Sequence, residues 1–128
     1  MIMLKDLTVM YVEDDKFTQN LIKKALEHLV KKVYLAQNGI EGFKLYKQVS
    51  PNIVLTDRHM PNMDGLEMSQ KIREIKPTQV IGMFTGDSQE QDNKSVDIDI
   101  YLIKPLNRRH FFNALNQLNS LTLSPLAK

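Results

Sequence analysis

The stretch LTVMYVEDDKFTQNLIKKALEHL, residues 7–29, predicts a β-strand followed directly by an α-helix. Its first six residues are apolar or β-branched and stop at Glu13-Asp14-Asp15, which is typical of a buried strand and the turn after it. An amphipathic helix is expected next, because apolar residues recur at four-residue steps with charged residues on the other face. The apolar positions are Phe17, Leu21, Ala25 and Leu29, and the charged ones are Lys23, Lys24 and Glu27. Asp15 is the candidate N-cap of this helix.

The alternation of strand and helix continues along the chain. Four more apolar runs of strand length are found at residues 33–36, 53–56, 80–84 and 98–103. Helical patterns begin after Asn38-Gly39, after Asp64-Gly65 and near Asn107, and the last runs to about Leu121. Ser50-Pro51 and Lys76-Pro77 end the first two, since the residue before proline avoids helical backbone. Strands that alternate with helices indicate βαβ units, so we predict an α/β fold, a doubly wound sheet of five parallel strands with about five helices.

The composition is that of one ordinary globular domain. The chain has 128 residues, of which 42% are hydrophobic and 25% charged, which excludes disordered and low-complexity classes. The formal net charge is only +2, so a dedicated nucleic-acid binder is not expected. The chain has no Cys for disulfides or thiolate metal sites, and no apolar run long enough for a transmembrane helix. Residues 1–6 have no signal-peptide core, so we expect a soluble cytoplasmic domain that does not bind membranes.

Polar residues stand at the ends of four of the predicted strands. They are Glu13-Asp14-Asp15, Asp57, Thr85-Gly86-Asp87 and Lys104-Pro105. In a doubly wound sheet the ligand binds beyond the carboxyl ends of the strands, so these residues are expected to converge at one edge. Carboxylates that cluster there repel one another, and a bound cation relieves the repulsion. Oxygen ligands without Cys suit Mg²⁺ or Mn²⁺, with Asp14 and Asp57 as candidate direct ligands and Glu13 as a ligand through water.

The same edge of the sheet suits a phosphoryl group. Lys104 supplies a compact positive charge, Thr85 supplies a hydroxyl donor, and Asp57 can act as the nucleophile that forms an acyl phosphate. Each residue taken singly has a commoner explanation as a helix cap, a turn residue or a strand terminator. Their position at successive strand ends of one predicted sheet favours the site. Asp64 is instead assigned, with Gly65, to the turn and cap of the helix that follows.

Five segments together resemble the receiver domain of bacterial two-component response regulators, the CheY-like superfamily. They are Tyr11–Asp15, Ala36–Glu41, Leu55–Gly65, Phe84–Gly86 and Tyr101–Pro105. The segment from Asp57 to Gly65 is the most specific, because its Asp, Met-Pro and Asp-Gly elements occur in register. The resemblance covers the chain from about Leu7 to Leu121. It implies a flavodoxin-like sheet of strand order 2-1-3-4-5, with residues 1–121 as the receiver domain and residues 122–128 as a C-terminal tail or the start of a linker.

The resemblance also implies roles for the acidic residues and their neighbours. Asp57 would accept a phosphoryl group from a phosphohistidine on a histidine kinase or a histidine phosphotransfer protein. Glu13 and Asp14 would form the acidic pair that holds Mg²⁺, with Asp14 as the direct ligand. His59 would contribute its backbone carbonyl to the metal. Taken from the residues alone, His59 is a solvated loop residue.

Three residues on later strands receive roles from the same resemblance. Thr85 and Lys104 would bind the phosphoryl oxygens after transfer, and Tyr101 matches the aromatic switch that turns inward as Thr85 moves. The Lys104-Pro105 peptide bond would be cis. Without the resemblance, Tyr101 is an ordinary half-buried strand aromatic.

Residues 86–100 depart from the family pattern. The family has an amphipathic helix and a small-residue turn here, whereas this stretch is shorter and has no apolar residue before Val96. A helix without an apolar face has little surface to bury and is marginal alone. We therefore expect this helix, the fourth of the fold, to be short, distorted or mobile. Gly86 also replaces the commoner Ala and loosens access to the phosphorylation site.

The function expected from these features is that of a phosphorylation-activated switch. It would assist only its own phosphorylation and dephosphorylation, and it would change its binding to a downstream protein or to an output domain outside this chain. One alternative is a Mg²⁺-dependent phosphatase with an aspartate nucleophile, similar to haloacid dehalogenases, although that family has a second Asp where this chain has His59. Another is a receiver-like module that binds partners without phosphorylation. A flavin-binding flavodoxin fits less well, because the first loop is acidic where a phosphate-binding loop needs donors.

Overall fold

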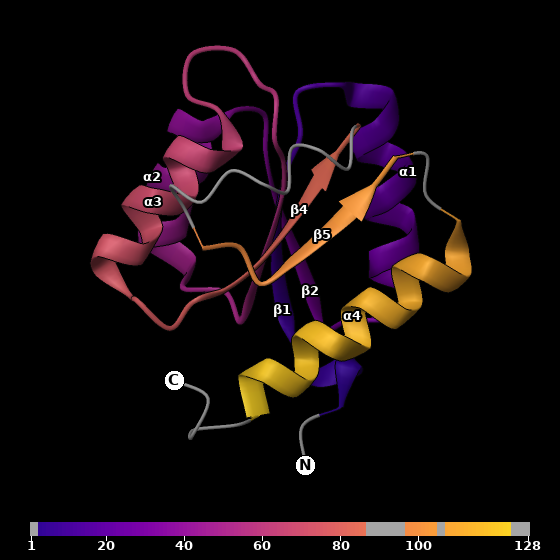
Figure 1. Cartoon of the computed structure of the whole chain (residues 1–128). Helices are drawn as coiled ribbons and strands as arrows, with labels where there is room; N and C mark the ends of the chain where they lie inside the picture. Colours follow the sequence, from indigo (N-terminus) through magenta and orange to yellow (C-terminus); the bar gives the residue numbers. More distant parts are fainter. Residues whose placement is uncertain (1–2, 87–96, 105–106, 124–128) are drawn as a thin grey trace.

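The computed structural model describes residues 3–86, 97–104 and 107–123, and Figure 1 shows their arrangement. Five parallel strands form one sheet in the order β2-β1-β3-β4-β5, which confirms the predicted flavodoxin-like α/β fold. The strands are β1 (Thr8–Val12), β2 (Lys32–Ala36), β3 (Ile53–Asp57), β4 (Val80–Thr85) and β5 (Ile100–Ile103). The helical elements of the described ranges are a 3₁₀ turn η1 (Leu4–Asp6), α1 (Lys16–Glu27), α2 (Gly39–Val49), α3 (Gly65–Ile75) and α4 (Arg108–Leu123).

Helices cover both faces of the sheet (Figure 1). On one face α1 and α4 contribute buried residues such as Leu26, Phe111 and Leu115. On the other face α2 and α3 contribute Tyr46 and Ile72. β3 and β4 are buried along their whole length between these two cores, which explains why they lack apolar and polar alternation. None of the helices in the described part of the chain has the length and apolar character needed to cross a membrane.

Helices α1, α2 and α3 each begin with a side-chain cap at the carboxyl edge of the sheet. Asp15 and Asp64, both predicted as caps, accept hydrogen bonds from backbone N–H groups of the first helical turn at 2.9 and 2.8 Å. Asn38, which was not predicted as a cap, caps α2 in the same way at 2.9 Å. These caps satisfy amides that the helix itself leaves free. They also fix the points at which the loops beyond β1, β2 and β3 turn into helices.

The predicted core face of α1 is wrong at its first two positions. Phe17 is 73% exposed and Leu21 is 56% exposed. The face that packs on the sheet instead holds Gln19, Ile22 and Leu26, which are spaced three and four residues apart. Each four-residue step rotates about 40° past a full turn of a 3.6-residue helix, so a series of such steps drifts off any one face. Alternating steps of three and four residues stay on the core side.

β5 starts later than predicted, at Ile100 instead of residue 98. The Asp99 carboxylate accepts a hydrogen bond from the backbone N–H of Ile81 at 2.8 Å and forms an ion pair with Arg73 at 3.0 Å. The side chain of Asp99 thus takes the place of a backbone acceptor beside β4, and the regular ladder of β5 begins at the next residue, Ile100.

The end of α4 also differs from the prediction, because the helix extends to Leu123 and not only to about residue 121. The hydroxyl of Thr122 donates to the Asn119 carbonyl at 2.7 Å within this last turn. Three further predictions fall on residues outside the described ranges: the irregular helix at 87–96, the cis bond before Pro105 and the tail at 124–128. These three stay predictions.

Candidate functional site

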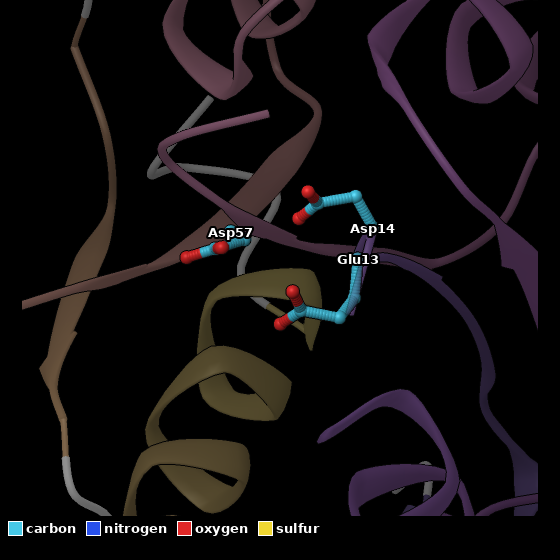
Figure 2. A group of neighbouring side chains, drawn as sticks. All are labelled: Glu13, Asp14 and Asp57. Carbon is cyan, nitrogen blue, oxygen red and sulfur yellow. The ribbon is translucent and has the colours of Figure 1, made fainter. Parts of the chain in front are cut away.

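Three predicted acidic residues meet at the carboxyl edge of the sheet, and we call them the acidic cluster. Asp57 is the last residue of β3, and Glu13 and Asp14 directly follow β1. Figure 2 shows Glu13 and Asp14 extending from the end of β1 toward Asp57. Each residue offers a carboxylate oxygen, and these three oxygens lie within 4.8 Å of one another. β1 and β3 are parallel neighbours with Val12 opposite Thr56, so the strand ends come together as the sequence predicts.

Lys104, directly after β5, brings a positive charge to the acidic cluster. Its ammonium nitrogen lies 3.0 Å from Asp57 Oδ1 and 3.7 Å from Glu13 Oε1. The backbone N–H of Lys104 donates to the Thr85 carbonyl at 2.8 Å, which ties the residue to the end of β4. Burial alone would lower the pKa of Lys104, but hydrogen bonding and attraction to Asp57 and Glu13 outweigh burial and raise the pKa. Lys104 is therefore cationic at neutral pH and positioned to meet an anionic group at Asp57.

Glu13 is the most buried member of the acidic cluster. Its side chain is 1% exposed, against 11% for Asp57. The Tyr11 hydroxyl donates to Glu13 Oε1 at 3.1 Å, and the Asp15 N–H donates to Oε2 at 3.2 Å. Burial and repulsion from Asp57 raise the pKa of Glu13, against the opposing effect of the surrounding donors. Oxygen donors under this repulsion suit a hard divalent cation.

Gln19 of α1 supports the acidic cluster and was not predicted to do so. Its side-chain amide donates to the Glu13 carbonyl at 3.2 Å and to the Ala36 carbonyl at 3.0 Å. The Glu13 N–H also donates to the Ala36 carbonyl, at 3.1 Å. These bonds fix the backbone of Glu13 against β2 and α1. The signal in the sequence is a Gln three residues before Ile22 on the packing face of α1, and it is visible only once that face is assigned correctly.

The loop after β3 turns tightly against Asp57. The Arg58 N–H donates to Asp57 Oδ1 at 3.0 Å, and the Gly65 N–H donates to the Arg58 carbonyl at 2.8 Å. A Cβ atom at Gly65 would overlap the Asp57 carbonyl oxygen, so this close approach requires glycine. Asn62 has a φ of 72°, in the left-handed region that Asn tolerates better than most residues. The loop therefore holds the Asp57 carboxylate in place through backbone contacts.

The remaining predicted site residues lie on β4, on β5 and in the loop after β3. Thr85, the last residue of β4, is 1% exposed. Tyr101 is half-buried in β5, in register with Met83 of β4. His59 is exposed in the loop after β3, as expected of a loop residue. The phosphoryl contacts of Thr85, the switch role of Tyr101 and the metal contact of the His59 carbonyl stay predictions.

Replacing Glu13 with Gln is expected to stabilise the metal-free protein at neutral pH, because burial and repulsion from Asp57 disfavour the charged carboxylate. Because the folded-state pKa is raised, the Glu13 carboxyl favours folding most below its ordinary pKa of 4.5 and loses that contribution as the pH rises through the folded-state pKa. Glu13→Gln removes this loss, so its gain in melting temperature is larger near pH 7 than near pH 4. Thermal unfolding in EDTA at both pH values measures the gain. Glu74→Gln, an exposed acid on α3, is the control, and an equal gain of Glu13→Gln at both pH values would contradict the prediction.

A family model described as "Response regulator receiver domain" matches residues 9–116. The chain belongs to the response regulator receiver domain family. The matched range includes β1 from Val9 onward, the other four strands and the acidic cluster, so the predicted resemblance is confirmed. The acidic cluster of this receiver domain is a group of carboxylates that could hold a metal ion.

Relatives of this receiver domain are signalling proteins of different length. Chemotaxis protein CheY of Halobacterium salinarum is 32% identical over 111 residues, which are 84% of this chain and 92% of that protein. Sensory transduction protein LytT of Oceanobacillus iheyensis is 34% identical over 70% of this chain and 37% of LytT. The probable C4-dicarboxylate response regulator DctR of Priestia megaterium is 31% identical over 88% of this chain and 52% of DctR. The chain thus spans nearly all of one relative and about half or less of the other two.

Solved structures share the fold of this receiver domain. A two-component transcriptional regulator AraC from Clostridium phytofermentans has a TM-score of 0.79 at 26% identity, over 92% of this chain and 95% of that chain. The receiver domain of the sensor histidine kinase PA1611 from Pseudomonas aeruginosa has a TM-score of 0.82 at 21% identity, over 90% of this chain and 98% of that chain. The PA1611 structure is described with a magnesium ion coordinated in its active site cleft.

Proposed function

We propose that this receiver domain is a phosphorylation-controlled switch whose phosphoacceptor is Asp57. The observation that carries the proposal is the 3.0 Å contact between Lys104 Nζ and Asp57 Oδ1 at the acidic cluster. Asp57 lies between the Lys104 ammonium and the oxygens that are proposed to bind a divalent ion, and this position suits a carboxylate that takes a phosphoryl group. The negative charge on the phosphoryl oxygens would meet the ammonium on one side and the ion on the other.

The proposed transfer exchanges one bond for another at phosphorus. A carboxylate oxygen of Asp57 attacks the phosphorus of a phosphohistidine on a histidine kinase or phosphotransfer protein. The O–P bond of an acyl phosphate forms as the N–P bond breaks, and the imidazole nitrogen leaves with the electron pair. Lys104 stays protonated and pairs with a phosphoryl oxygen. Later attack by water on phosphorus releases inorganic phosphate and restores the Asp57 carboxylate.

The acidic cluster fits Mg²⁺ or Mn²⁺ by its chemistry, because it offers three oxygen donors within 4.8 Å and no thiolate. We assign Asp14 and Asp57 as direct protein ligands, with Glu13 acting through water and His59 through its backbone carbonyl. The bound ion supplies positive charge that offsets the carboxylates and the phosphoryl oxygens. The magnesium in the PA1611 receiver domain supports this assignment.

In the proposed switch, a conformational change is transmitted from Asp57 through Thr85 to Tyr101. Thr85 is buried at the end of β4, and Tyr101 is in register with Met83, two residues before Thr85. A phosphoryl group on Asp57 would attract the Thr85 hydroxyl and the Lys104 ammonium, and Tyr101 would turn inward as Thr85 moves. The changed surface would alter binding to a downstream protein or to an output domain. The signalling names of the relatives CheY, LytT and DctR support this role.

Mg²⁺-dependent labelling tests the proposed function. Incubation with a small acyl phosphate and Mg²⁺ should add one phosphoryl group, seen by intact mass, because the donor can replace the phosphohistidine in the same exchange. EDTA should prevent the labelling, and added Mn²⁺ should restore it. Steady turnover of a phosphate ester in place of a single labelling event would favour the phosphatase. No labelling at all would favour a receiver-like module that binds partners without phosphorylation.

A further inference from the structure

Tyr11 lies beneath the acidic cluster with no exposed surface. Its ring meets Phe84 edge to face, with centroids 5.8 Å apart and planes at 69°, and Phe84 stacks on Phe111 of α4 at 6.3 Å. These buried contacts fix the direction of the phenol. Residues two apart on a strand share a face, so the Tyr11 hydroxyl points along β1 to Glu13 and donates to Glu13 Oε1 at 3.1 Å.

Glu13 Oε1 stands between two donors of different kinds. The Tyr11 hydroxyl is 3.1 Å away, and the Lys104 ammonium is 3.7 Å away. Lys104 is closer to Asp57, at 3.0 Å, so two carboxylates are within reach of one cation. A buried carboxylate oxygen needs a donor. Without the phenol, Glu13 would move toward Lys104 and draw the ammonium away from Asp57.

The second oxygen of Glu13 is held as well. The Asp15 N–H donates to Oε2 at 3.2 Å, so Tyr11 and Asp15 hold the two oxygens of one carboxylate from β1 and from the loop that follows. A metal-binding carboxylate that is fixed by neighbouring donors keeps its orientation when the ion arrives. Glu13 thereby keeps an oxygen within 4.8 Å of the oxygens of Asp14 and Asp57.

We propose that the Tyr11 hydroxyl is a positioning group of the receiver site. By holding Glu13 apart from Lys104, it keeps Glu13 available to a divalent cation and keeps Lys104 available to Asp57. The inference rests on the proposed function, which assigns the cation and the phosphoryl group to this site. Tyr11 touches neither of them and acts through Glu13 alone.

Tyr11→Phe tests the inference, because it removes the hydroxyl and keeps the ring against Phe84. The Mg²⁺ dissociation constant, measured by calorimetry, should rise severalfold, which is less than the roughly tenfold or more lost with a donor behind a direct ligand, because Glu13 acts on the ion through water. The Mg²⁺ concentration for half-maximal acyl-phosphate labelling should rise in parallel, while the rate at saturating Mg²⁺ stays within about twofold of wild type. Tyr34→Phe, on β2 opposite Met10, is the control and should change neither quantity. An unchanged Mg²⁺ affinity in Tyr11→Phe would overturn the inference.

Two further measurements separate positioning from a general loss of structure. In a Glu13→Gln background, Tyr11→Phe should cause no further loss of Mg²⁺ affinity, because the hydroxyl acts through the Glu13 carboxylate. In a crystal structure of metal-free Tyr11→Phe, that carboxylate should lie within about 3 Å of the Lys104 ammonium. An unmoved Glu13 in that crystal would also overturn the inference, whether or not the protein binds Mg²⁺. If the proposed function is wrong, the wild-type protein takes no label, and that result is distinct from the two results that would overturn the inference about Tyr11.

Discussion

Asp57→Asn is expected to remove all covalent labelling by a small acyl phosphate in the presence of Mg²⁺. The side-chain amide has the shape of the carboxylate but lacks the anionic oxygen that attacks phosphorus. Its carbonyl oxygen can still accept the hydrogen bond from the Arg58 N–H, which is 3.0 Å long to Asp57, so the loop should keep its path. Intact mass before and after incubation measures the loss.

Asp64→Asn is the matched control for this substitution. It makes the same chemical change in the same loop, at the residue that caps α3 through the Glu67 N–H at 2.8 Å. Asn caps helices about as well as Asp, so the variant should fold and label like wild type. Labelled Asp57→Asn protein would show that another acid is the nucleophile. Asp14 would then be the next residue to replace, because its carboxylate lies in the same cluster.

Gly65→Ala is expected to lower the free energy of unfolding by about 2–4 kcal/mol, because a methyl group must be forced into a packed backbone turn. The added Cβ would overlap the Asp57 carbonyl oxygen and stand 3.2 Å from the Arg58 Cα. Both neighbours are backbone atoms, which cannot swing aside as a long side chain can. The melting temperature should fall by on the order of 10 °C. Labelling should also slow, because the strain falls on Asp57, the proposed phosphoacceptor.

Gly86→Ala is the control for the glycine substitution. Gly86 follows β4 at the same edge of the sheet, and a Cβ built there meets nothing within 4 Å. The unfolding midpoint of Gly86→Ala in urea should therefore stay close to that of wild type. If Gly65→Ala and Gly86→Ala have equal midpoints, the close approach of the β3–α3 loop to Asp57 is not a constraint on the fold.

Element order and helix starts could be predicted because they depend on short-range chemistry. Apolar runs of strand length and capping residues such as Asp15 and Asp64 act within a few residues of their own position. The burial of α1 could not be predicted as well, since four-residue spacing placed Phe17 and Leu21 on the core face and both are largely exposed. The packing face of a short helix depends on how it is rotated against the sheet, and several rotations satisfy the same pattern.

Two residues that support the site, Gln19 and Tyr11, also could not be predicted from the sequence. Gln19 looks like any polar helix residue until α1 is placed over the ends of β1 and β2, where its amide bonds to the Glu13 and Ala36 carbonyls. Tyr11 looks like an apolar strand residue until its hydroxyl is seen to meet Glu13 at 3.1 Å. Both act on residues whose own roles were predicted, so they modify the site without defining it.

The identity of the residues that gather at the site follows from the order of strands and helices along the chain. Parallel strands all end at one edge of a sheet, so Glu13, Asp14, Asp57 and Lys104 had to converge once the alternation of strands and helices was recognised. The way in which those charges pair with one another depends on how the folded elements pack. Lys104 lies 3.0 Å from Asp57 but 3.7 Å from Glu13, and the buried Glu13 takes the Tyr11 hydroxyl instead. Differences below 1 Å between competing partners arise from the packing of whole elements, which no local pattern of residues encodes.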